Sequence, residues 1–261
     1  MSDAAPIERE VAVGGLDCRV WEKGTGERVG FLAGFGGLVR WPPFLDRLAE
    51  QRRVIAPSLP GFPGARGHDR LDSLVDWIAA TLDLLEAAGL AGADLVGASV
   101  GGTLAAEIAA LSPAAVRNLV LLAPLGMFDP DAPPTDVWAV RDDQLPALLC
   151  VRPERLIEQL RPPEGVDAFE HMITLARASE AAARLLWPTT DTGIAKRLHR
   201  VRAPTLILWG AHDRVLAPSY AERFARGIGG GARVRVFADA GHRLELDAPD
   251  EAARAILDFL R

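Results

Sequence analysis

Cysteine is scarce in this chain, whose 261 residues include only Cys18 and Cys150. These two lie far apart and in no spacing typical of a metal site, which indicates two reduced, buried thiols rather than a disulfide framework. No apolar run approaches the length that a membrane span requires. Residues 1–10 lack the basic and apolar regions of a secretory signal. We therefore expect a cytoplasmic protein that has no membrane as a partner.

Clusters of basic residues are equally rare. Lysine and arginine come together only in short pairs such as Arg52-Arg53 and Lys196-Arg197, and the formal net charge is −6. Such a chain should repel phosphate backbones, so we do not expect a nucleic-acid partner. The apolar fraction of 49% is ordinary for a globular protein and sufficient for a two-sided core. The partner that we expect is a small-molecule substrate, bound by a monomer or a homodimer.

Short apolar segments alternate with helical patterns along most of the chain. This alternation indicates a parallel sheet that is buried on both faces. Two β-like runs at residues 10–13 and 17–21 predict an opening hairpin, which would add antiparallel strands at one edge. The other expected strands are residues 29–33, 54–56, 93–97, 119–123, 205–209 and 233–237, and the expected helices are residues 41–51, 71–88, 101–111 and 249–260.

The alternation stops over residues 128–199, which are rich in proline, helix-prone and without a convincing strand. We interpret this stretch as a helical lid inserted into a core made of residues 1–127 and 200–261. Its aromatic side chains would either line an apolar substrate pocket or only pack lid helices together. The candidates for the pocket are Phe128, Trp138 and Trp187.

The most informative local pattern is Gly97-Ala98-Ser99-Val100-Gly101, a G-x-S-x-G sequence between an expected strand and an expected helix. A sharp strand-to-helix turn strains the serine, and only small neighbours avoid collision with it. The turn also raises the hydroxyl above the strand ends and lets the Val100 amide donate to a developing oxyanion. The alternative is a small-residue turn that merely packs a helix against a strand. The flanking elements favour Ser99 as a nucleophile.

A neutral serine requires a base, and His242 is the histidine placed to supply it. It follows the last expected strand, and Gly241 before it would let the chain turn so that the imidazole points back over the sheet. The alternative is a histidine exposed in a loop. The chain order nucleophile, acid, base favours the catalytic interpretation.

The base needs an acid that orients it, and Asp213 follows the preceding expected strand. A carboxylate at that strand end can reach the imidazole and hold its tautomer. Asp129, which follows an earlier strand, and Glu245 are the alternatives. The adjacent His212 should diverge from Asp213 and have a structural role.

A second oxyanion donor is expected in the loop Ala33-Gly34-Phe35-Gly36-Gly37. Backbone must approach a substrate closely there, which favours glycine. Phe35 is the expected amide donor, and its ring would line the substrate pocket together with Gly34. The loop matches neither a P-loop nor G-x-G-x-x-G, and its other interpretation is a tight turn that binds nothing.

Together these segments resemble the α/β-hydrolase superfamily, specifically its lid-bearing bacterial serine hydrolases. The resemblance implies an α/β fold with a mostly parallel eight-stranded sheet flanked by helices, and a helical lid after the sixth strand. It also implies a Ser-Asp-His triad that needs no cofactor and no metal. The matching segments are residues 34–37, 60–64, 97–102, 210–213 and 241–242.

Three positions depart from the pattern of many relatives. Ala33 replaces a histidine and Ser58 an aspartate, and neither position takes part in bond breaking in this superfamily. Arg243 stands where carbon–carbon bond hydrolases commonly have tryptophan. Ser99 argues against epoxide hydrolases and haloalkane dehalogenases, which use an aspartate nucleophile.

The reaction that we expect is hydrolysis of a carboxylic ester with a small or medium, largely apolar substrate, through an acyl-enzyme. One alternative is a carbon–carbon bond hydrolase of ring-fission-type diketone acids. That reaction would require an arginine clamp for the substrate carboxylate, for which Arg177 and Arg184 are candidates. The alternative from another class is a protein that keeps the pocket and binds a ligand without turnover.

Overall fold

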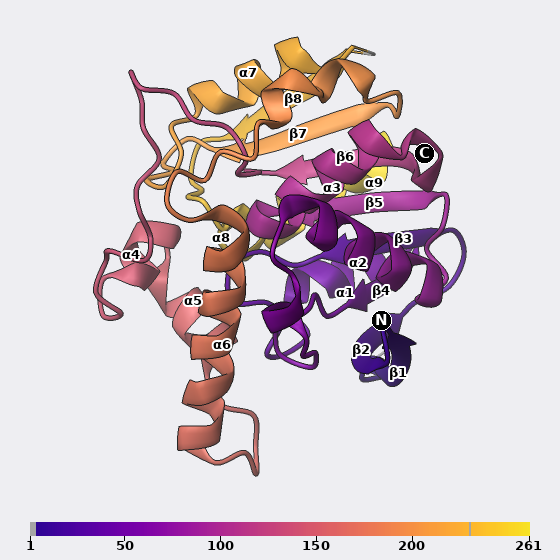
Figure 1. The fold of residues 1–261 in the computed structure, drawn as a ribbon, viewed down its shortest axis with the longest axis vertical. Helices are drawn as coiled ribbons and strands as arrows, with labels where there is room; N and C mark the ends of the chain where they lie inside the picture. The colour runs from indigo at the N-terminus through magenta and orange to yellow at the C-terminus, as the bar shows by residue number, and fades with distance from the viewer. Residues whose placement is uncertain (1–3, 230) are drawn as a thin grey trace.

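A single eight-stranded sheet forms the centre of the computed structural model, which describes residues 4–229 and 231–261 (Figure 1). Residues 1–3 and 230, which the expected core includes, lie outside the described residues. The strand order is β1-β2-β4-β3-β5-β6-β7-β8. The strands are β1 Ile7–Val13, β2 Leu16–Lys23, β3 Arg28–Leu32, β4 Arg53–Pro57, β5 Ala93–Ala98, β6 Val116–Leu122, β7 Thr205–Gly210 and β8 Ala232–Phe237.

The sheet is parallel from β4 to β8, whereas β1 and β2 run antiparallel at one edge. Every residue of β5 and β7 is buried. A strand covered on both faces is apolar at nearly every position rather than alternating. The charged exception here is the buried Asp94 of β5, whose carboxylate is paired with Arg117. The predicted parallel sheet with an edge hairpin is confirmed.

Helices cover both faces of the sheet (Figure 1). Helices α1 (Pro43–Ala49) and α9 (Pro249–Phe259) pack against each other, and α2 (Leu74–Ala87) packs against α3 (Ser99–Leu111). The remaining helices outside residues 128–199 are α7 Ser219–Gly227, α8 Leu244–Asp247 and the short 3₁₀ turns His68–Arg70 and Pro113–Ala115. A further 3₁₀ turn, Leu198–Arg200, spans the end of that range.

Helix α7 has no counterpart among the elements expected from the sequence. It buries Tyr220 and Phe224, four residues apart, and turns Glu222 and Arg226 outward. This spacing is the signal that could have found it, because residues four apart share one face of a helix.

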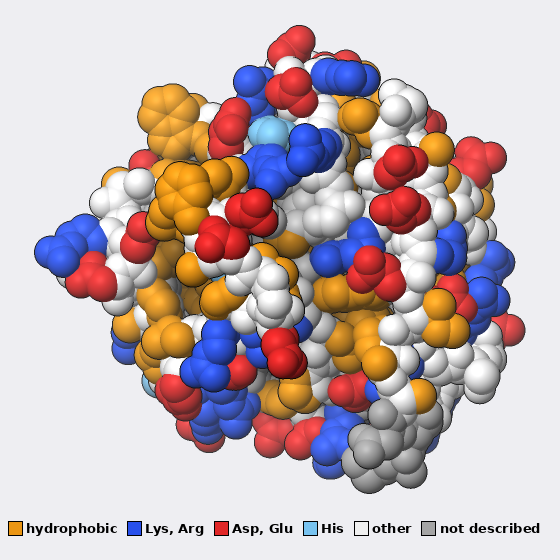
Figure 2. Space-filling model, turned by 90° about the horizontal axis from the view of Figure 1, so that it is seen from below, with side chains coloured by type: hydrophobic (Ala, Val, Ile, Leu, Met, Phe, Trp, Pro, Cys, Tyr) orange, Lys and Arg blue, Asp and Glu red, His pale blue; other side chains and the backbone are white. Residues whose placement is uncertain are grey.

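Residues 128–199, which we call the inserted segment, lie between β6 and β7 and contain helices but no strand. These helices extend away from the sheet, and α6 is the longest of them (Figure 1). Viewed from below, side chains of apolar and charged type are interspersed over this part of the surface (Figure 2). The helices are α4 Leu145–Leu149, α5 Pro153–Leu160, α6 Ala168–Leu186 and the 3₁₀ turn Ile194–Lys196.

A buried ion pair ties the end of the inserted segment to helix α3. Glu107 is fully buried and accepts hydrogen bonds from Arg197 Nε at 2.8 Å and Arg197 Nη2 at 2.6 Å. The Thr192 hydroxyl donates to the same carboxylate at 2.6 Å. Because α3 begins at Ser99, this contact fixes the inserted segment to the helix that carries the expected nucleophile.

The two cysteines are free and buried, as the sequence predicts. Burial raises the pKa of both thiols, more strongly for Cys150. No helix among residues 4–229 and 231–261 is long and apolar enough to cross a membrane. In the same part of the chain, no three His, Cys, Asp or Glu side chains are grouped to hold a metal ion.

Candidate active site

Ser99 stands at the sharp turn between β5 and α3. Its φ angle is +48°, in the left-handed region that a side chain rarely adopts. A Cβ atom at Gly97 would lie 2.6 Å from the Gly101 carbonyl oxygen, and one at Gly101 would lie 2.3 Å from that of Leu32. Both positions therefore require glycine, which explains the G-x-S-x-G spacing by steric contact alone.

The structure brings Ser99, His242 and Asp213 together in one hydrogen-bonded chain. The His242 Nε2 atom lies 2.8 Å from the Ser99 hydroxyl oxygen, and its Nδ1 atom lies 2.9 Å from Asp213 Oδ2. All three residues are buried. With Nδ1 donating to the carboxylate, Nε2 is left to accept the proton of the serine hydroxyl.

The Asp213 carboxylate is held at both oxygens. Its Oδ1 atom accepts the backbone amides of Val215 at 2.8 Å and Leu216 at 2.9 Å, which leaves Oδ2 for His242. The neighbouring His212 is exposed and takes no part in this arrangement. The backbone therefore fixes the direction from which the carboxylate meets the imidazole.

The two alternative acids are bound elsewhere. Asp129 pairs with Arg223 at 2.5 Å, beside the Tyr220 hydroxyl that accepts the Asp129 amide. Glu245 pairs with Arg243 at 2.5 Å. Asp129 and Glu245 thus each form an ion pair with an arginine, whereas Asp213 binds His242.

The glycine-rich loop after β3 lies directly against Ser99. A Cβ atom at Gly34 would come within 3.0 Å of Ser99 Cβ, and a turn closes the loop through a 2.9 Å bond from the Gly37 amide to the Gly34 carbonyl. Val100, the other expected amide donor, is the second residue of α3, where backbone amides have no acceptor within the helix. The loop and the helix start therefore flank the serine hydroxyl.

The four aromatic residues expected at the pocket divide into two pairs. The Phe35 and Trp138 rings meet edge to face at 6.0 Å, and Trp138 Nε1 donates to the Ser179 carbonyl of α6 at 3.1 Å. Phe128 and Trp187 are 41% and 59% exposed. Trp138 thus links the glycine-rich loop to α6. Phe128 and Trp187 lie in loops at the surface and are not part of the contact between Phe35 and Trp138.

Arg177 and Arg184 lie on the outward side of α6. Arg184 pairs with Glu180 at 3.3 Å, and Arg177 lines a surface cleft with Leu16 and Arg66. Arg177 therefore faces the turn of the edge hairpin, whereas Arg184 is exposed beside Glu180. Among the described residues, no hydrogen bond or ion pair joins either arginine to Ser99, Asp213 or His242.

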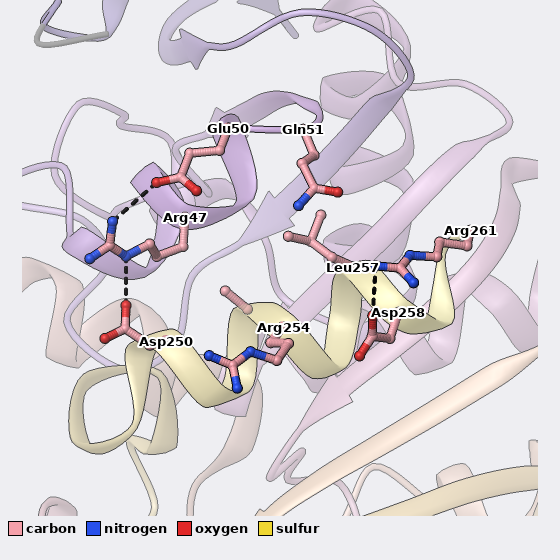
Figure 3. Close-up of a pocket in the computed structure, with 9 residues that line it drawn as sticks. Arg47, Glu50, Gln51, Asp250, Arg254, Leu257, Asp258 and Arg261 are labelled. Atoms are coloured by element: carbon pink, nitrogen blue, oxygen red, sulfur yellow. Dashed lines mark hydrogen bonds and ion pairs between the residues drawn. The ribbon is translucent and has the colours of Figure 1, made fainter. Parts of the chain in front are cut away.

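A second hollow lies between α1 and α9 and has none of the triad residues in its wall (Figure 3). Five of the charged side chains that line it are paired with one another. Arg47 bonds to both Asp250 at 2.6 Å and Glu50 at 3.0 Å, and Arg261 bonds to Asp258 at 3.1 Å. Charges satisfied in this way describe a solvated surface rather than a binding site.

One positioning residue was missed by reasoning from the sequence. The buried Asp247 carboxylate accepts the backbone amides of Gly241, Val151 and Arg152 at 2.8, 2.9 and 2.9 Å. It thereby joins the loop of His242 to the inserted segment. An aspartate five residues after the expected base carries no local signal of this role, because two of its three partners are nearly a hundred residues away.

Comparison with known proteins agrees with this arrangement of strands. The sequence pattern of the Alpha/beta hydrolase family matches residues 31–255, most of the chain. This chain belongs to that family. The expected superfamily and fold are thereby confirmed.

The chain is similar to two proteins from Pseudomonas putida. The chain is 29% identical to the dihydrolipoyllysine-residue acetyltransferase component of the acetoin cleaving system, over 98% of this chain and 70% of that protein. It is 28% identical to 2-hydroxy-6-oxo-2,4-heptadienoate hydrolase, over 98% of this chain and 97% of that protein.

Solved structures share the fold of this α/β hydrolase. A membrane phospholipase A superposes with a TM-score of 0.77 at 25% identity, over 98% of this chain and 86% of that one. A meta-cleavage product hydrolase from Pseudomonas fluorescens superposes with a TM-score of 0.71 at 19% identity, over 97% of each chain. The second likeness shows the fold alone.

Proposed function

We propose that this α/β hydrolase cleaves carboxylic esters of small or medium, largely apolar substrates through an acyl-enzyme formed on Ser99. The observation that carries the proposal is the buried chain of hydrogen bonds from Asp213 through His242 to Ser99. A nucleophile, a base within reach of its proton and a carboxylate that orients the base are what acyl transfer requires.

The reaction proceeds in two halves. Ser99 attacks the ester carbonyl while His242 accepts its proton, and the amides of Phe35 and Val100 stabilise the tetrahedral oxyanion. The intermediate collapses, the protonated His242 gives its proton to the departing alcohol, and an acyl group remains on Ser99. His242 then takes a proton from water, the resulting hydroxide attacks the acyl group, and the carboxylic acid leaves as Ser99 recovers its proton.

The inserted segment is the lid in this proposal, and residues 1–127 with 200–261 form the catalytic core. Trp138 supports the assignment, because it reaches from the inserted segment to the ring of Phe35 and to α6. Gly34 and these two aromatic side chains would then form the apolar wall next to the nucleophile. Substrates with short or medium acyl chains fit such a wall.

The second candidate reaction is hydrolysis of a carbon–carbon bond in a ring-fission-type diketone acid. It is favoured by the similarity to 2-hydroxy-6-oxo-2,4-heptadienoate hydrolase along nearly the whole of both chains. It is disfavoured by the positions of the two arginines expected as the carboxylate clamp and of Arg243. Arg177 and Arg184 line the outer side of α6, and Arg243 is already paired with Glu245. We therefore place ester hydrolysis first.

The test is a substrate comparison with purified protein. p-Nitrophenyl esters from acetate to decanoate are assayed beside a chromophoric ring-fission acid, with wild type and Ser99→Ala in parallel. We expect turnover of the shorter esters, loss of at least about 10⁴-fold in kcat for Ser99→Ala, and fluorophosphonate labelling of wild type alone. Faster turnover of the ring-fission acid would favour the second candidate. Absence of labelling and of turnover in wild type would support a ligand-binding protein without catalysis.

A further inference from the structure

Arg243, which directly follows His242, reaches the glycine-rich loop from the opposite side of the site. Its Nη1 atom donates to the Phe35 carbonyl oxygen at 2.9 Å, and its Nε atom donates to Glu245 Oε1 at 2.5 Å. The side chains of Arg243 and Glu245 are each only 3% exposed. A buried ion pair thus connects the residue after the base to the residue expected to bind the oxyanion.

Burial of this pair calls for a reason beyond stability. Removing two charges from water is costly, and a buried ion pair commonly stabilises a fold no better than apolar side chains of similar volume. Moreover, among the described residues no hydrogen-bond partner is found for the buried Glu245 Oε2.

The geometry of the pair suits orientation. Arginine is planar, and its fork of donors has fixed directions, so binding Glu245 through Nε determines where Nη1 points. Glu245 lies in α8, and the Arg243 amide donates to the Leu149 carbonyl at 2.9 Å. The backbone of Arg243 is therefore held by Leu149 and its guanidinium by Glu245. The direction in which Nη1 donates to the Phe35 carbonyl is restricted as a result.

The loop that receives this bond has little rigidity of its own. Phe35 is flanked by Gly34 and by Gly36, and Gly36 has a φ of +83°. Glycine allows a wide range of backbone angles, so the direction of the Phe35 amide is not set by local sterics. An anchor on the carbonyl of the same residue restricts that freedom.

We propose that Arg243, held by Glu245, is a positioning residue that keeps the Phe35 amide directed at the oxyanion. The inference rests on the proposed serine hydrolase function and deepens it. It links the base to the oxyanion loop, because Arg243, which orders that loop, directly follows His242 in the chain.

The test compares Arg243→Met, Arg243→Lys and Glu245→Gln with wild type on a p-nitrophenyl ester. Methionine fills the space but donates no hydrogen bond, so we expect kcat to fall about 10- to 100-fold with little change in KM, somewhat less than for outright loss of one oxyanion donor. Lysine keeps the positive charge, but its ammonium group lacks the planar pair of donors that binds Glu245 and the Phe35 carbonyl together. Arg243→Lys should therefore not restore wild-type kcat. Glu245→Gln removes the charge that holds Arg243 in place and leaves a buried guanidinium without its partner, so kcat should fall in this variant as well. Arg254→Met is the matched control, because Arg254 is exposed on α9, and it should retain wild-type kcat.

Two further readouts separate orientation from a general loss of structure. An alkylboronic acid forms a tetrahedral adduct with the serine, and its affinity should fall by the same factor as kcat/KM in Arg243→Met. The pH at which kcat/KM reaches half its maximum should stay unchanged, because His242 and Asp213 are untouched. If Arg243→Met does not fold, the same comparison is made with Arg243→Lys.

The inference is overturned if folded Arg243 variants keep wild-type kcat, or lose kcat without losing boronic acid affinity. It is also overturned if the pH midpoint moves with kcat, which would mean that the base was disturbed instead. Failure of the proposed function is distinguishable, since wild type itself would then neither turn over esters nor react with a fluorophosphonate.

Discussion

The Asp247 carboxylate accepts the amide hydrogen of Gly241, the residue immediately before His242, at 2.8 Å. The same carboxylate accepts the amides of Val151 and Arg152 at the start of α5. The side chains of Arg152 and Arg155 reinforce this junction by donating to the Asp247 carbonyl. The first part of the inserted segment is thus bound to the loop of the base, so we expect it to move with the core rather than as a free flap.

Replacing Asp247 by alanine should therefore impair both stability and activity. Three backbone amides lose their acceptor, that of Gly241 buried and those of Val151 and Arg152 partly buried. Each unsatisfied buried group costs about 1–3 kcal/mol, and water relieves part of this cost at the partly buried amides. We expect a loss of about 3–5 kcal/mol in unfolding free energy from urea denaturation, and a fall in kcat/KM of about tenfold or more. Asp250→Ala is the control, because its ion pair with Arg47 is exposed and screened by solvent, so its loss should have little effect on stability. If Asp247→Ala and Asp250→Ala lowered stability and kcat/KM equally, Asp247 would not be the residue that positions the loop of His242.

A methyl group at Gly34 should reduce turnover without unfolding the protein. In Gly34→Ala the new Cβ would lie 3.0 Å from Ser99 Cβ and 3.2 Å from the Ala98 carbonyl oxygen, so the loop must shift away from the nucleophile. We expect kcat to fall about 10- to 100-fold, since oxyanion donors are effective only in place.

Gly165→Ala is the control for the general effect of replacing a glycine by alanine. Its φ is +79° and the space around it is open, so it strains only the backbone, by about 1–2 kcal/mol. Steady-state kinetics and thermal melting of both variants make the comparison. Wild-type kcat in Gly34→Ala would show that the loop does not take part in the reaction.

Loss of the Arg197 side chain should destabilise the fold strongly. Arg197→Met leaves the fully buried Glu107 carboxylate without its charge partner, which typically costs about 3–5 kcal/mol. Arg184→Met removes an exposed pair with Glu180 and should cost no more than about 1 kcal/mol. Chemical denaturation at neutral pH measures both values. A small effect for Arg197→Met would mean that Glu107 is protonated or solvated when alone.

The two thiols should resist modification in the folded protein. Burial raises the pKa of Cys18 and Cys150, and a raised pKa leaves less of the reactive thiolate at pH 8 than an ordinary cysteine has. Ellman's reagent should therefore titrate close to two thiols per chain only after denaturation. Rapid reaction of either thiol under native conditions would contradict the burial of that residue.

Local patterns in the sequence were sufficient for the main features of the fold. Continuous apolar strands predict a sheet covered on both faces, and the glycines around Ser99 predict the strained turn, because both depend on contacts between chain neighbours or on simple burial. Helix α7 was not predicted, although the spacing of Tyr220 and Phe224 is typical of one face of a helix.

Only the tertiary structure could decide which distant groups meet. Asp129 and Asp213 both follow expected strands, and packing determines that their partners are Arg223 and His242. Glu245 instead pairs with Arg243, two residues before it. Packing also determines the bond between Arg243 and the Phe35 carbonyl, which joins residues 208 positions apart. Sequence encodes residue type and local conformation, whereas hydrogen-bond partners at long range are set by how the strands and loops align in space.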